Sequence, residues 1–128
     1  MVGSAANVRL FLVGPMGSGK STVGRHLADL LDCPFIDSDA EIESRAGADI
    51  PWIFDVEGEA GFRRRETTVL KDLVEHPAAV IATGGGAILA AENREMMARA
   101  GVVVFLNVSV AQQLKRTGSG EGLSLIHI

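Results

Sequence analysis

The stretch Gly14-Pro15-Met16-Gly17-Ser18-Gly19-Lys20-Ser21-Thr22 fits the pattern G-x-x-x-x-G-K-[ST]. Its glycines allow the backbone to curl, so that consecutive N–H groups point inward and form a concave anion site. A helix that begins near Lys20 would add the positive end of its dipole to the same place. The stretch therefore predicts a loop that holds the phosphates of a nucleotide, with contacts from Gly17, Ser18, Gly19, Lys20, Ser21 and Thr22.

Two side chains of this loop carry specific chemistry. Lys20 can reach the outer phosphates of ATP as a mobile cation, and the Ser21 hydroxyl can ligate the Mg²⁺ that accompanies ATP. The flanking residues argue against a chance match in a glycine-rich turn. Residues 9–13 read as a short buried strand, and residues 23–31 place apolar side chains at helical spacing. Strand, loop and helix are the context that this pattern requires.

Length and composition predict a single globular domain, since the chain has 128 residues of which 47% are hydrophobic. A formal net charge of −4 disfavours nonspecific binding to nucleic acid or to an anionic membrane. No apolar run approaches the ~20 residues of a membrane-spanning helix, and residues 1–7 lack the pattern of a signal peptide. The single cysteine, Cys33, cannot form an internal disulfide, so a cytoplasmic location is expected.

Two carboxylates follow the second predicted strand, residues 34–37. Because strand, helix and strand in this order form a parallel βαβ unit, Asp37 and Asp39 fall at the carboxyl edge of the sheet, beside the phosphate loop. Carboxylates there would repel a triphosphate unless a cation intervened. This predicts Mg²⁺ for one Asp and the hydroxyl group of an acceptor for the other. The alternative is that either Asp caps the helix that follows.

The rest of the chain alternates between helical and strand patterns. Helices are expected over residues 39–46, from residue 50, and over residues 62–75, 87–100 and 109–116, and strands over residues 78–83 and 102–106. Residues 57–61 are expected to interrupt the helical pattern. The alternation predicts an α/β fold in which helices cover both faces of a parallel sheet.

Further features point to an anionic acceptor. Arg63-Arg64-Arg65 opens the helix expected at 62–75, where cations oppose the helix dipole, so at least one arginine is expected to hold an anion such as a carboxylate. Gly84-Gly85-Gly86 directly follows a buried strand and indicates a close approach to the backbone. The alternative for the arginine run is a solvated helix face, and the alternative for the glycine run is a flexible connection. Trp52-Ile53-Phe54 fits core packing and a pocket wall equally well.

Taken together, residues 7–116 resemble the shikimate kinases, a family of P-loop small-molecule kinases. The resemblance rests on the phosphate loop, Asp37-Ser38-Asp39, Phe54 followed by Glu57-Gly58-Glu59, Phe62-Arg63, Thr83-Gly84-Gly85-Gly86, and residues 113–117. It implies a nucleoside-monophosphate-kinase-like P-loop fold. It also implies transfer of the γ-phosphate of ATP to the 3-hydroxyl of shikimate, which gives shikimate 3-phosphate in chorismate and aromatic amino acid biosynthesis.

The resemblance also implies roles for single residues. Lys20 would hold the ATP phosphates, Asp39 would bind the shikimate hydroxyls and help to deprotonate the acceptor, and Arg63 would pair with the shikimate carboxylate. These three are the expected catalytic residues, and Asp37 would orient Mg²⁺ together with Ser21. The remaining expected contacts are those of Gly84, Gly85, Gly86, Phe54 and Phe62 with shikimate, and that of Arg116 with adenine.

The family pattern stops after Thr117. The resemblance therefore predicts an incomplete kinase domain over residues 1–117, without the lid, last strand and closing helix of the family. The Gly/Ser-rich and then apolar residues 118–128 are expected to be a non-native or read-through tail. Such a chain is expected to be a monomer that binds nucleotide weakly and is weakly active or inactive. The alternatives are another P-loop kinase, similar to gluconate kinases, and a non-catalytic nucleotide-binding fragment.

Overall fold

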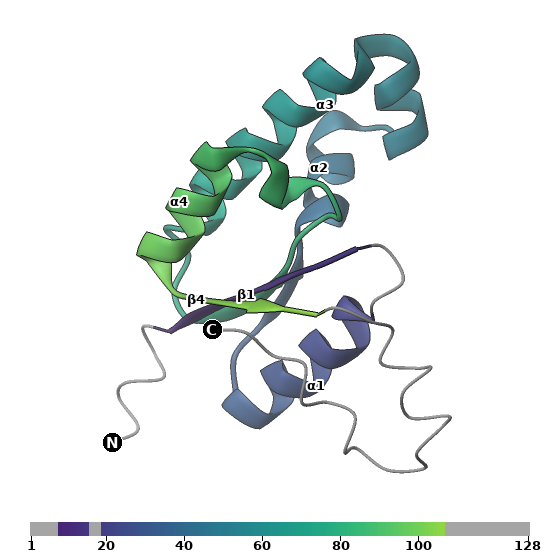
Figure 1. Cartoon of the computed structure of the whole chain (residues 1–128). Helices are drawn as coiled ribbons and strands as arrows, with labels where there is room; N and C mark the ends of the chain where they lie inside the picture. Colours follow the sequence, from purple (N-terminus) through teal and green to yellow (C-terminus); the bar gives the residue numbers. More distant parts are fainter. Residues whose placement is uncertain (1–7, 16–18, 107–128) are drawn as a thin grey trace.

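The computed structural model describes residues 8–15 and 19–106, which form an α/β fold (Figure 1). The elements in chain order are β1 (Arg9–Val13), α1 (Lys20–Leu31), β2 (Phe35–Asp37), α2 (Ser38–Ala46), α3 (Ile50–Leu73), β3 (Ala79–Ala82), the 3₁₀ turn η2 (Ala87–Leu89), α4 (Ala91–Ala100) and β4 (Val102–Phe105). The expected order of strands and helices is confirmed up to β4. The helix expected at 109–116, the tail 118–128, and Gly17, Ser18 and Arg116 lie outside the described residues.

The four strands form one parallel sheet in the order β2-β3-β1-β4. The crossover from β1 through α1 to β2 therefore skips one position, and β3 lies between these two strands. Ala82 at the end of β3 is in register with Leu12 of β1 and with Asp37 of β2. The glycine run after β3 consequently emerges between the phosphate loop and the acidic pair.

Helices cover both faces of the sheet, with α1 on one side and α2, α3 and α4 on the other (Figure 1). Alternation along β1 divides its side chains between the two layers. Phe11 and Val13 pack toward α2, α3 and α4, while Leu12 packs toward Ala28 of α1. Among the described residues, no helix combines the length and the apolar character that crossing a membrane would require.

The break expected at residues 57–61 is confined to a single residue. Helix α3 runs from Ile50 to Leu73, and only Gly58 leaves helical geometry, with φ 74° and ψ 177°. The prediction that the arginine run opens a helix is therefore wrong, because Arg63 lies more than a turn beyond the kink. The dipole at a helix N-terminus gives no reason for these arginines to bind an anion. The helix also ends at Leu73 rather than at residue 75.

The helix expected at residues 87–100 is also divided. Ala87–Leu89 forms a 3₁₀ turn, Ala90 is extended, and α4 begins at Ala91. Side chains of α4 hold the carbonyl groups of the short turn. The Asn93 side chain donates to the Ala87 carbonyl at 2.9 Å, and Arg94 donates to the Ile88 carbonyl at 2.7 Å. These bonds fix the segment that follows the glycine run.

Replacing Gly58 with alanine is expected to destabilise the protein by about 1–3 kcal/mol, because its backbone angles are almost exclusive to glycine. A Cβ at this position would meet no atom within 4 Å, so the cost is a backbone cost. Urea unfolding followed by circular dichroism measures it. The matched control is Gly47→Ala, also at positive φ with open space but in the milder left-handed helical region. Equal losses for the two variants would contradict the expectation.

Candidate active site

The predicted site residues converge at the carboxyl edge of the sheet. A cavity of about 240 Å³ lies there, and it is lined by Gly19, Lys20, Ser21, Thr22, Asp37, Asp39, Ala82, Thr83, Gly84 and Gly85. Three connections meet at this cavity: the one from β1 into α1, the one from β2 into α2, and the one that leaves β3. The expectation that the phosphate loop, the acidic pair and the glycine run share one edge is confirmed for the described residues.

Lys20, the first residue of α1, lies over the loop that precedes it. Its Nζ donates to the carbonyl oxygens of Gly14 at 2.8 Å and Pro15 at 3.0 Å. Burial lowers the pKa of Lys20 and outweighs the opposing influence of the Asp39 and Asp37 charges. Helix α1 has no capping side chain and no acidic residue in its first turn. The positive end of a twelve-residue helix and a lysine ammonium thus face the same cavity.

Asp37 has the capping role that the sequence allowed for either aspartate. Its Oδ1 accepts hydrogen bonds from the N–H groups of Asp39 at 2.9 Å and Ala40 at 3.4 Å. The Ser21 hydroxyl and the second Asp37 oxygen have no partner within the described chain. Carboxylate and hydroxyl oxygens suit Mg²⁺. The described residues contain no cluster of three or more His, Cys, Asp or Glu side chains that could hold a metal ion, so Mg²⁺ here would need phosphate and water ligands as well.

Asp39 presents an unsatisfied oxygen to the site. Its Oδ1 is buried and has no hydrogen-bond partner. Gly84 makes room for it, because a Cβ on Gly84 would lie only 2.6 Å from this atom. Burial and the Asp37 charge raise the pKa of Asp39, against the opposing charges of Lys20 and Arg63. Asp39 is therefore an acceptor without a donor, at the place where an acceptor hydroxyl was expected.

Arg63 of α3 is held by an acidic residue that the sequence analysis missed. Arg63 Nη1 lies 2.9 Å from Glu66 Oε1, and the Glu66 side chain is 1% exposed. The other Glu66 oxygen, Oε2, has no hydrogen-bond partner. Burial raises the pKa of Glu66, and the hydrogen bond from Arg63 opposes this shift. The sequence contains a signal for Glu66: this carboxylate falls between Phe62 and Val69, on the apolar side of the helix.

The aromatic residues of α3 divide between core and site. Ile53 is buried in the core, whereas Trp52 is 52% exposed. Phe54 stacks on Phe62 with ring centroids 4.8 Å apart, and the Arg63 guanidinium lies over the Phe62 ring at 5.1 Å. In the run Trp52-Ile53-Phe54, Ile53 therefore belongs to the core, Trp52 is exposed to solvent, and Phe54 packs on Phe62 near Arg63. The stacked pair forms the support beneath Arg63.

The third glycine of the run sits against this arginine. A Cβ at Gly86 would lie 2.5 Å from Arg63 Nη2, so a side chain there would displace the guanidinium from its present position. The cavity at the phosphate loop includes Gly84 and Gly85, whereas Gly86 faces Arg63. The triple glycine thus makes room for two expected substrate ligands, Asp39 and Arg63, as well as for a close approach to the backbone.

Glu66→Gln is expected to flatten the dependence of stability on pH. The folded-state pKa of Glu66 lies above its ordinary value of 4.5, so the folded protein binds this proton more readily than the unfolded chain does. The parent should therefore gain stability as pH falls through the raised pKa toward 4.5, and the variant should lack that share of the gain. Urea unfolding at pH 5, 6 and 7 measures it, with Glu92→Gln on the exposed face of α4 as control. Identical slopes for Glu66→Gln and the parent would contradict the expectation.

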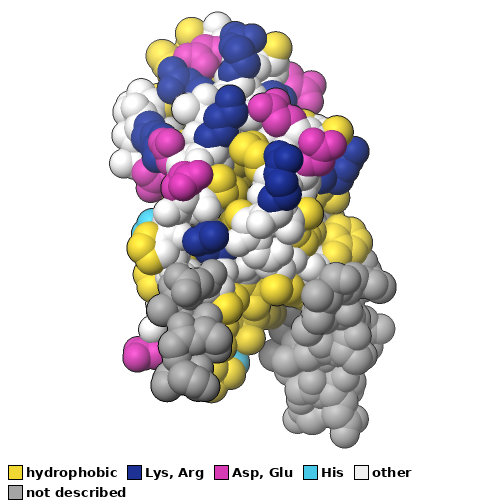
Figure 2. Space-filling view, turned by 90° about the vertical axis from the view of Figure 1, so that its left-hand side faces the viewer, with side chains coloured by type: hydrophobic (Ala, Val, Ile, Leu, Met, Phe, Trp, Pro, Cys, Tyr) yellow, Lys and Arg dark blue, Asp and Glu magenta, His cyan; other side chains and the backbone are white. Residues whose placement is uncertain are grey.

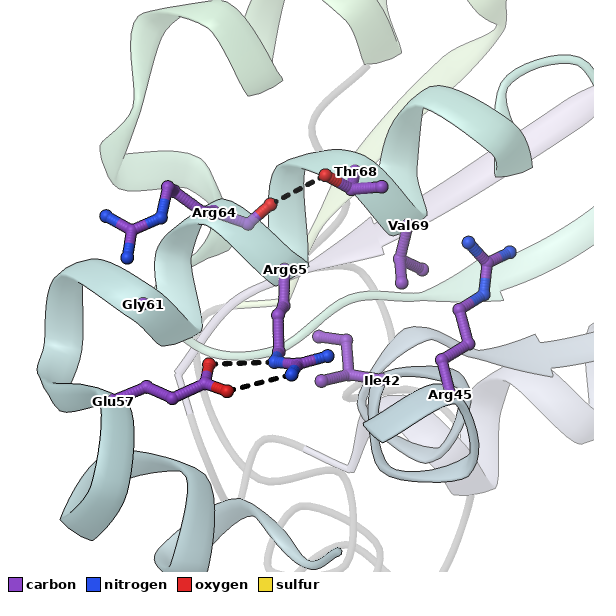
Figure 3. Close-up of a pocket in the computed structure, with 8 residues that line it drawn as sticks. All are labelled: Ile42, Arg45, Glu57, Gly61, Arg64, Arg65, Thr68 and Val69. Atoms are coloured by element: carbon purple, nitrogen blue, oxygen red, sulfur yellow. Dashed lines mark hydrogen bonds and ion pairs between the residues drawn. The ribbon is translucent and has the colours of Figure 1, made fainter. Parts of the chain in front are cut away.

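A larger cavity, of about 390 Å³, lies between α2 and the kinked helix α3 (Figure 3). It is lined by Ile42, Arg45, Glu57, Gly61, Arg64, Arg65, Thr68 and Val69. None of these belongs to the phosphate loop, the acidic pair or the glycine run. The smaller cavity is the candidate active site, because the phosphate-binding and carboxylate groups converge there.

The fold and the site have the features of a P-loop nucleotide-binding domain: a parallel sheet, a phosphate-loop sequence that leads into a helix, and a pair of carboxylates at the same edge of the sheet. Comparisons with known proteins agree. The family model of shikimate kinases matches residues 16–124. A shikimate kinase of Vibrio cholerae is 57% identical over 108 residues, which are 84% of this chain and 62% of that protein. One of Halorhodospira halophila is 60% identical over 109 residues, 85% of this chain and 62% of the relative.

Solved structures give the same result. The shikimate kinase of Acinetobacter baumannii in complex with shikimate has a TM-score of 0.81 and 51% identity, and the match covers 100% of this chain and 72% of that chain. The shikimate kinase of Aquifex aeolicus has a TM-score of 0.76 and 43% identity, over 89% of this chain and 68% of its own. The chain belongs to the shikimate kinase family. It spans 62% of the length of the Vibrio cholerae relative.

Proposed function

We propose that this chain carries the phosphate-transfer site of an enzyme that moves the γ-phosphate of ATP to the 3-hydroxyl of shikimate. The observation that carries the proposal is the Oδ1 atom of Asp39, which is buried and has no hydrogen-bond partner. The positive charges of Lys20 and Arg63 both act on this carboxylate. A hydroxyl donor that also bears a carboxylate satisfies both groups: the hydroxyl bonds to Asp39 and the carboxylate pairs with Arg63. Shikimate is such a molecule, and the Acinetobacter baumannii relative is described in complex with it.

In this proposal the protein acts mainly by positioning and by neutralising charge, as phosphoryl transfer requires. The backbone N–H groups at the start of α1 and the Lys20 ammonium bind the ATP phosphates. Asp39 accepts the hydrogen bond of the 3-hydroxyl and takes its proton as the new O–P bond forms, while the bond between the γ-phosphorus and the β,γ-bridging oxygen breaks and ADP leaves. Mg²⁺, when bound through Ser21 and Asp37, supplies further charge neutralisation at the phosphates.

Arg63 orients the acceptor. Its guanidinium can donate two parallel hydrogen bonds to a carboxylate, and its own position is set by Glu66 and by the Phe62 ring. The other Glu66 oxygen, Oε2, is buried and has no hydrogen-bond partner, so Glu66 acts in this proposal through Arg63 and not on the substrate. A monomeric state and a cytoplasmic location stay predictions that belong to the same proposal.

The test is ADP release from Mg-ATP in the presence and absence of shikimate. We expect shikimate-dependent release, with gluconate inactive as the alternative acceptor. The same assay is run on the chain extended at its carboxyl end to the length of the Acinetobacter baumannii relative. Release with gluconate would transfer the assignment to another P-loop kinase. Silence of both versions with every acceptor, despite ATP binding, would leave a non-catalytic nucleotide-binding chain and overturn the proposal.

A further inference from the structure

An ion pair bridges the kink of α3, outside the cavity assigned to the phosphates. Glu57 is the last residue before the kink at Gly58, and Arg65 lies two turns beyond it. The Arg65 guanidinium donates from Nε to Glu57 Oε1 and from Nη2 to Glu57 Oε2, both at 2.8 Å (Figure 3). Such a bidentate pair constrains orientation as well as distance. The two partners therefore fix the angle between the halves of α3.

The half of α3 before the kink, residues 50–57, is called the arm here. Its Phe54 stacks on Phe62, which lies beyond the kink and beneath Arg63. The stack depends on the angle between the two halves, because its two rings come from opposite sides of the kink. Gly61 permits this angle, because a Cβ there would lie 2.5 Å from the Glu57 Cβ. The arm thus folds back closely on the part of α3 that carries Arg63.

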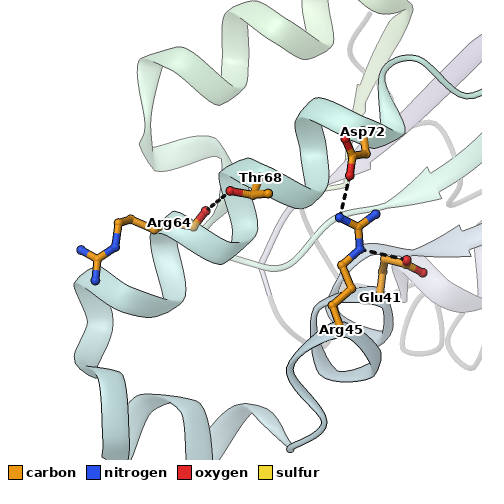
Figure 4. A network of polar contacts seen from close by, with 5 residues as sticks. All are labelled: Glu41, Arg45, Arg64, Thr68 and Asp72. Carbon is orange, nitrogen blue, oxygen red and sulfur yellow. Dashed lines mark hydrogen bonds and ion pairs between the residues drawn. The ribbon is translucent and has the colours of Figure 1, made fainter.

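Other polar contacts hold α2, the far end of α3 and the start of the arm. These contacts do not reach the end of the arm. Arg45 of α2 donates to Asp72 at 2.6 Å and to Glu41 at 3.1 Å, which ties α2 to the far end of α3 (Figure 4). The start of the arm is held by the Ile50 N–H, which donates to Glu43 at 2.8 Å. Toward its end the arm borders the cavity of about 390 Å³, so packing there is incomplete.

We propose that Glu57 and Arg65 are positioning residues of the substrate site, which hold the arm so that Phe54 supports Phe62 beneath Arg63. This inference rests on the proposed function, since Arg63 is the expected partner of the substrate carboxylate. Loss of the pair frees the end of the arm, beyond the buried Ile53, to tilt into the neighbouring cavity, and the support under the guanidinium weakens. Within the described residues, no hydrogen bond or ion pair joins this pair to α1 or β1, which carry the ATP side of the site.

The sequence offers a matched control in Arg64. It is adjacent to Arg65, but no dashed line joins its guanidinium to Glu57 in Figure 3, and no salt bridge within the described chain includes it. Figure 2 views the molecule from the side on which α4 lies in Figure 1, and over the upper part of that face basic and acidic side chains lie next to one another. Removing one more exposed cation therefore changes the general charge little, and Arg64→Met separates the specific pair from net charge.

The experiment measures kcat and the KM values for shikimate and ATP for the parent, Glu57→Gln, Arg65→Met, Arg65→Lys, the exchanged pair Glu57→Arg/Arg65→Glu, and Arg64→Met. We expect the KM for shikimate to rise about three- to tenfold in Glu57→Gln and Arg65→Met, with kcat and the KM for ATP within about twofold of the parent. Arg65→Lys, which keeps the charge but loses one hydrogen bond, should have a KM for shikimate between those of the parent and Arg65→Met. The exchanged pair should recover most of the loss, and Arg64→Met should match the parent.

A second measurement reports binding without turnover. Trp52 is the only tryptophan of the chain and lies on the arm, so its fluorescence can follow shikimate titration directly. If the parent binds shikimate but releases no ADP, the proposed function is wrong, and the binding data for the variants still test this inference. If shikimate does not bind, both fall. The inference alone is overturned if the variants bind shikimate like the parent, or if they lose ATP and shikimate affinity equally together with a lower Tm.

Discussion

Replacement of Lys20 by methionine is expected to lower kcat/KM for ATP about a thousandfold, the largest loss of any single change considered. The methionine keeps the length and apolar stem of the lysine but removes the only cation that the described chain places over the phosphate-binding loop. Charge that develops on the transferred phosphoryl group would then lose its direct protein counter-charge. The helix N-terminus and Mg²⁺ would remain, so measurable residual activity is expected.

The measurement is coupled ADP release across an ATP titration, together with thermal unfolding. Lys71→Met is the matched control, because Lys71 is 61% exposed on α3 and lies 3.8 Å from Glu92. It should match the parent in both assays. Lys20→Met should fold normally, since its Nζ contacts only the carbonyl groups of its own loop within the described residues. A variant with at least a tenth of the parent activity would show that Lys20 does not act at the transferred phosphate.

Replacement of Asp39 by asparagine is expected to lower kcat about a hundredfold and at the same time to stabilise the protein. Asparagine retains an oxygen that can accept the hydrogen bond but cannot take the proton of the hydroxyl. The gain in stability follows from the raised pKa of Asp39, since burial makes its ionised form unfavourable. Because the group is only half-buried, solvent screening limits the gain to about 1 kcal/mol or less at neutral pH.

The pH dependence gives this prediction a direction. The folded-state pKa of Asp39 lies above its ordinary value of 3.8, so its contribution to stability grows as pH falls through the raised pKa toward 3.8. Asp39→Asn should remove this pH-dependent contribution to the free energy of unfolding. In the parent, kcat should fall on the acid side as Asp39 becomes protonated, at a higher pH than an ordinary aspartate would give. Asp29→Asn on the exposed face of α1 is the control. A destabilised Asp39→Asn variant with unchanged activity would contradict both halves of the expectation.

Much of the site could be predicted because its chemistry is local in the chain. The phosphate loop with Lys20 and Ser21 is one continuous stretch. Asp37-Ser38-Asp39 begins at the last residue of β2, and the triple glycine follows β3 after one residue, Thr83. In a parallel sheet all carboxyl ends share one edge, so three local patterns were sufficient to expect one site. Periodicity also placed the strands and most helix ends to within two residues.

Predictions failed where a single backbone angle or a distant partner decides the result. The break expected at residues 57–61 is present but narrower than the pattern indicated, because only Gly58, with a positive φ, leaves helical geometry. The 3₁₀ turn at Ala87–Leu89 depends on bonds from Asn93 and Arg94. Glu66 was missed because its pairing with Arg63 matters only when the burial of that helix face is known.

The sequence by itself determined the class of fold and the parts of the candidate site, because glycine loops, strand–helix alternation and helix caps are properties of short segments. Only the tertiary structure decided how these parts are combined. The order β2-β3-β1-β4 places the glycine run between the phosphate loop and the acidic pair. The burial of Asp39 and Glu66, and the angle at Gly58 that stacks Phe54 on Phe62, likewise arise from packing between segments. Desolvation and side-chain contact depend on neighbours distant in sequence, and these exist only once the layers have assembled.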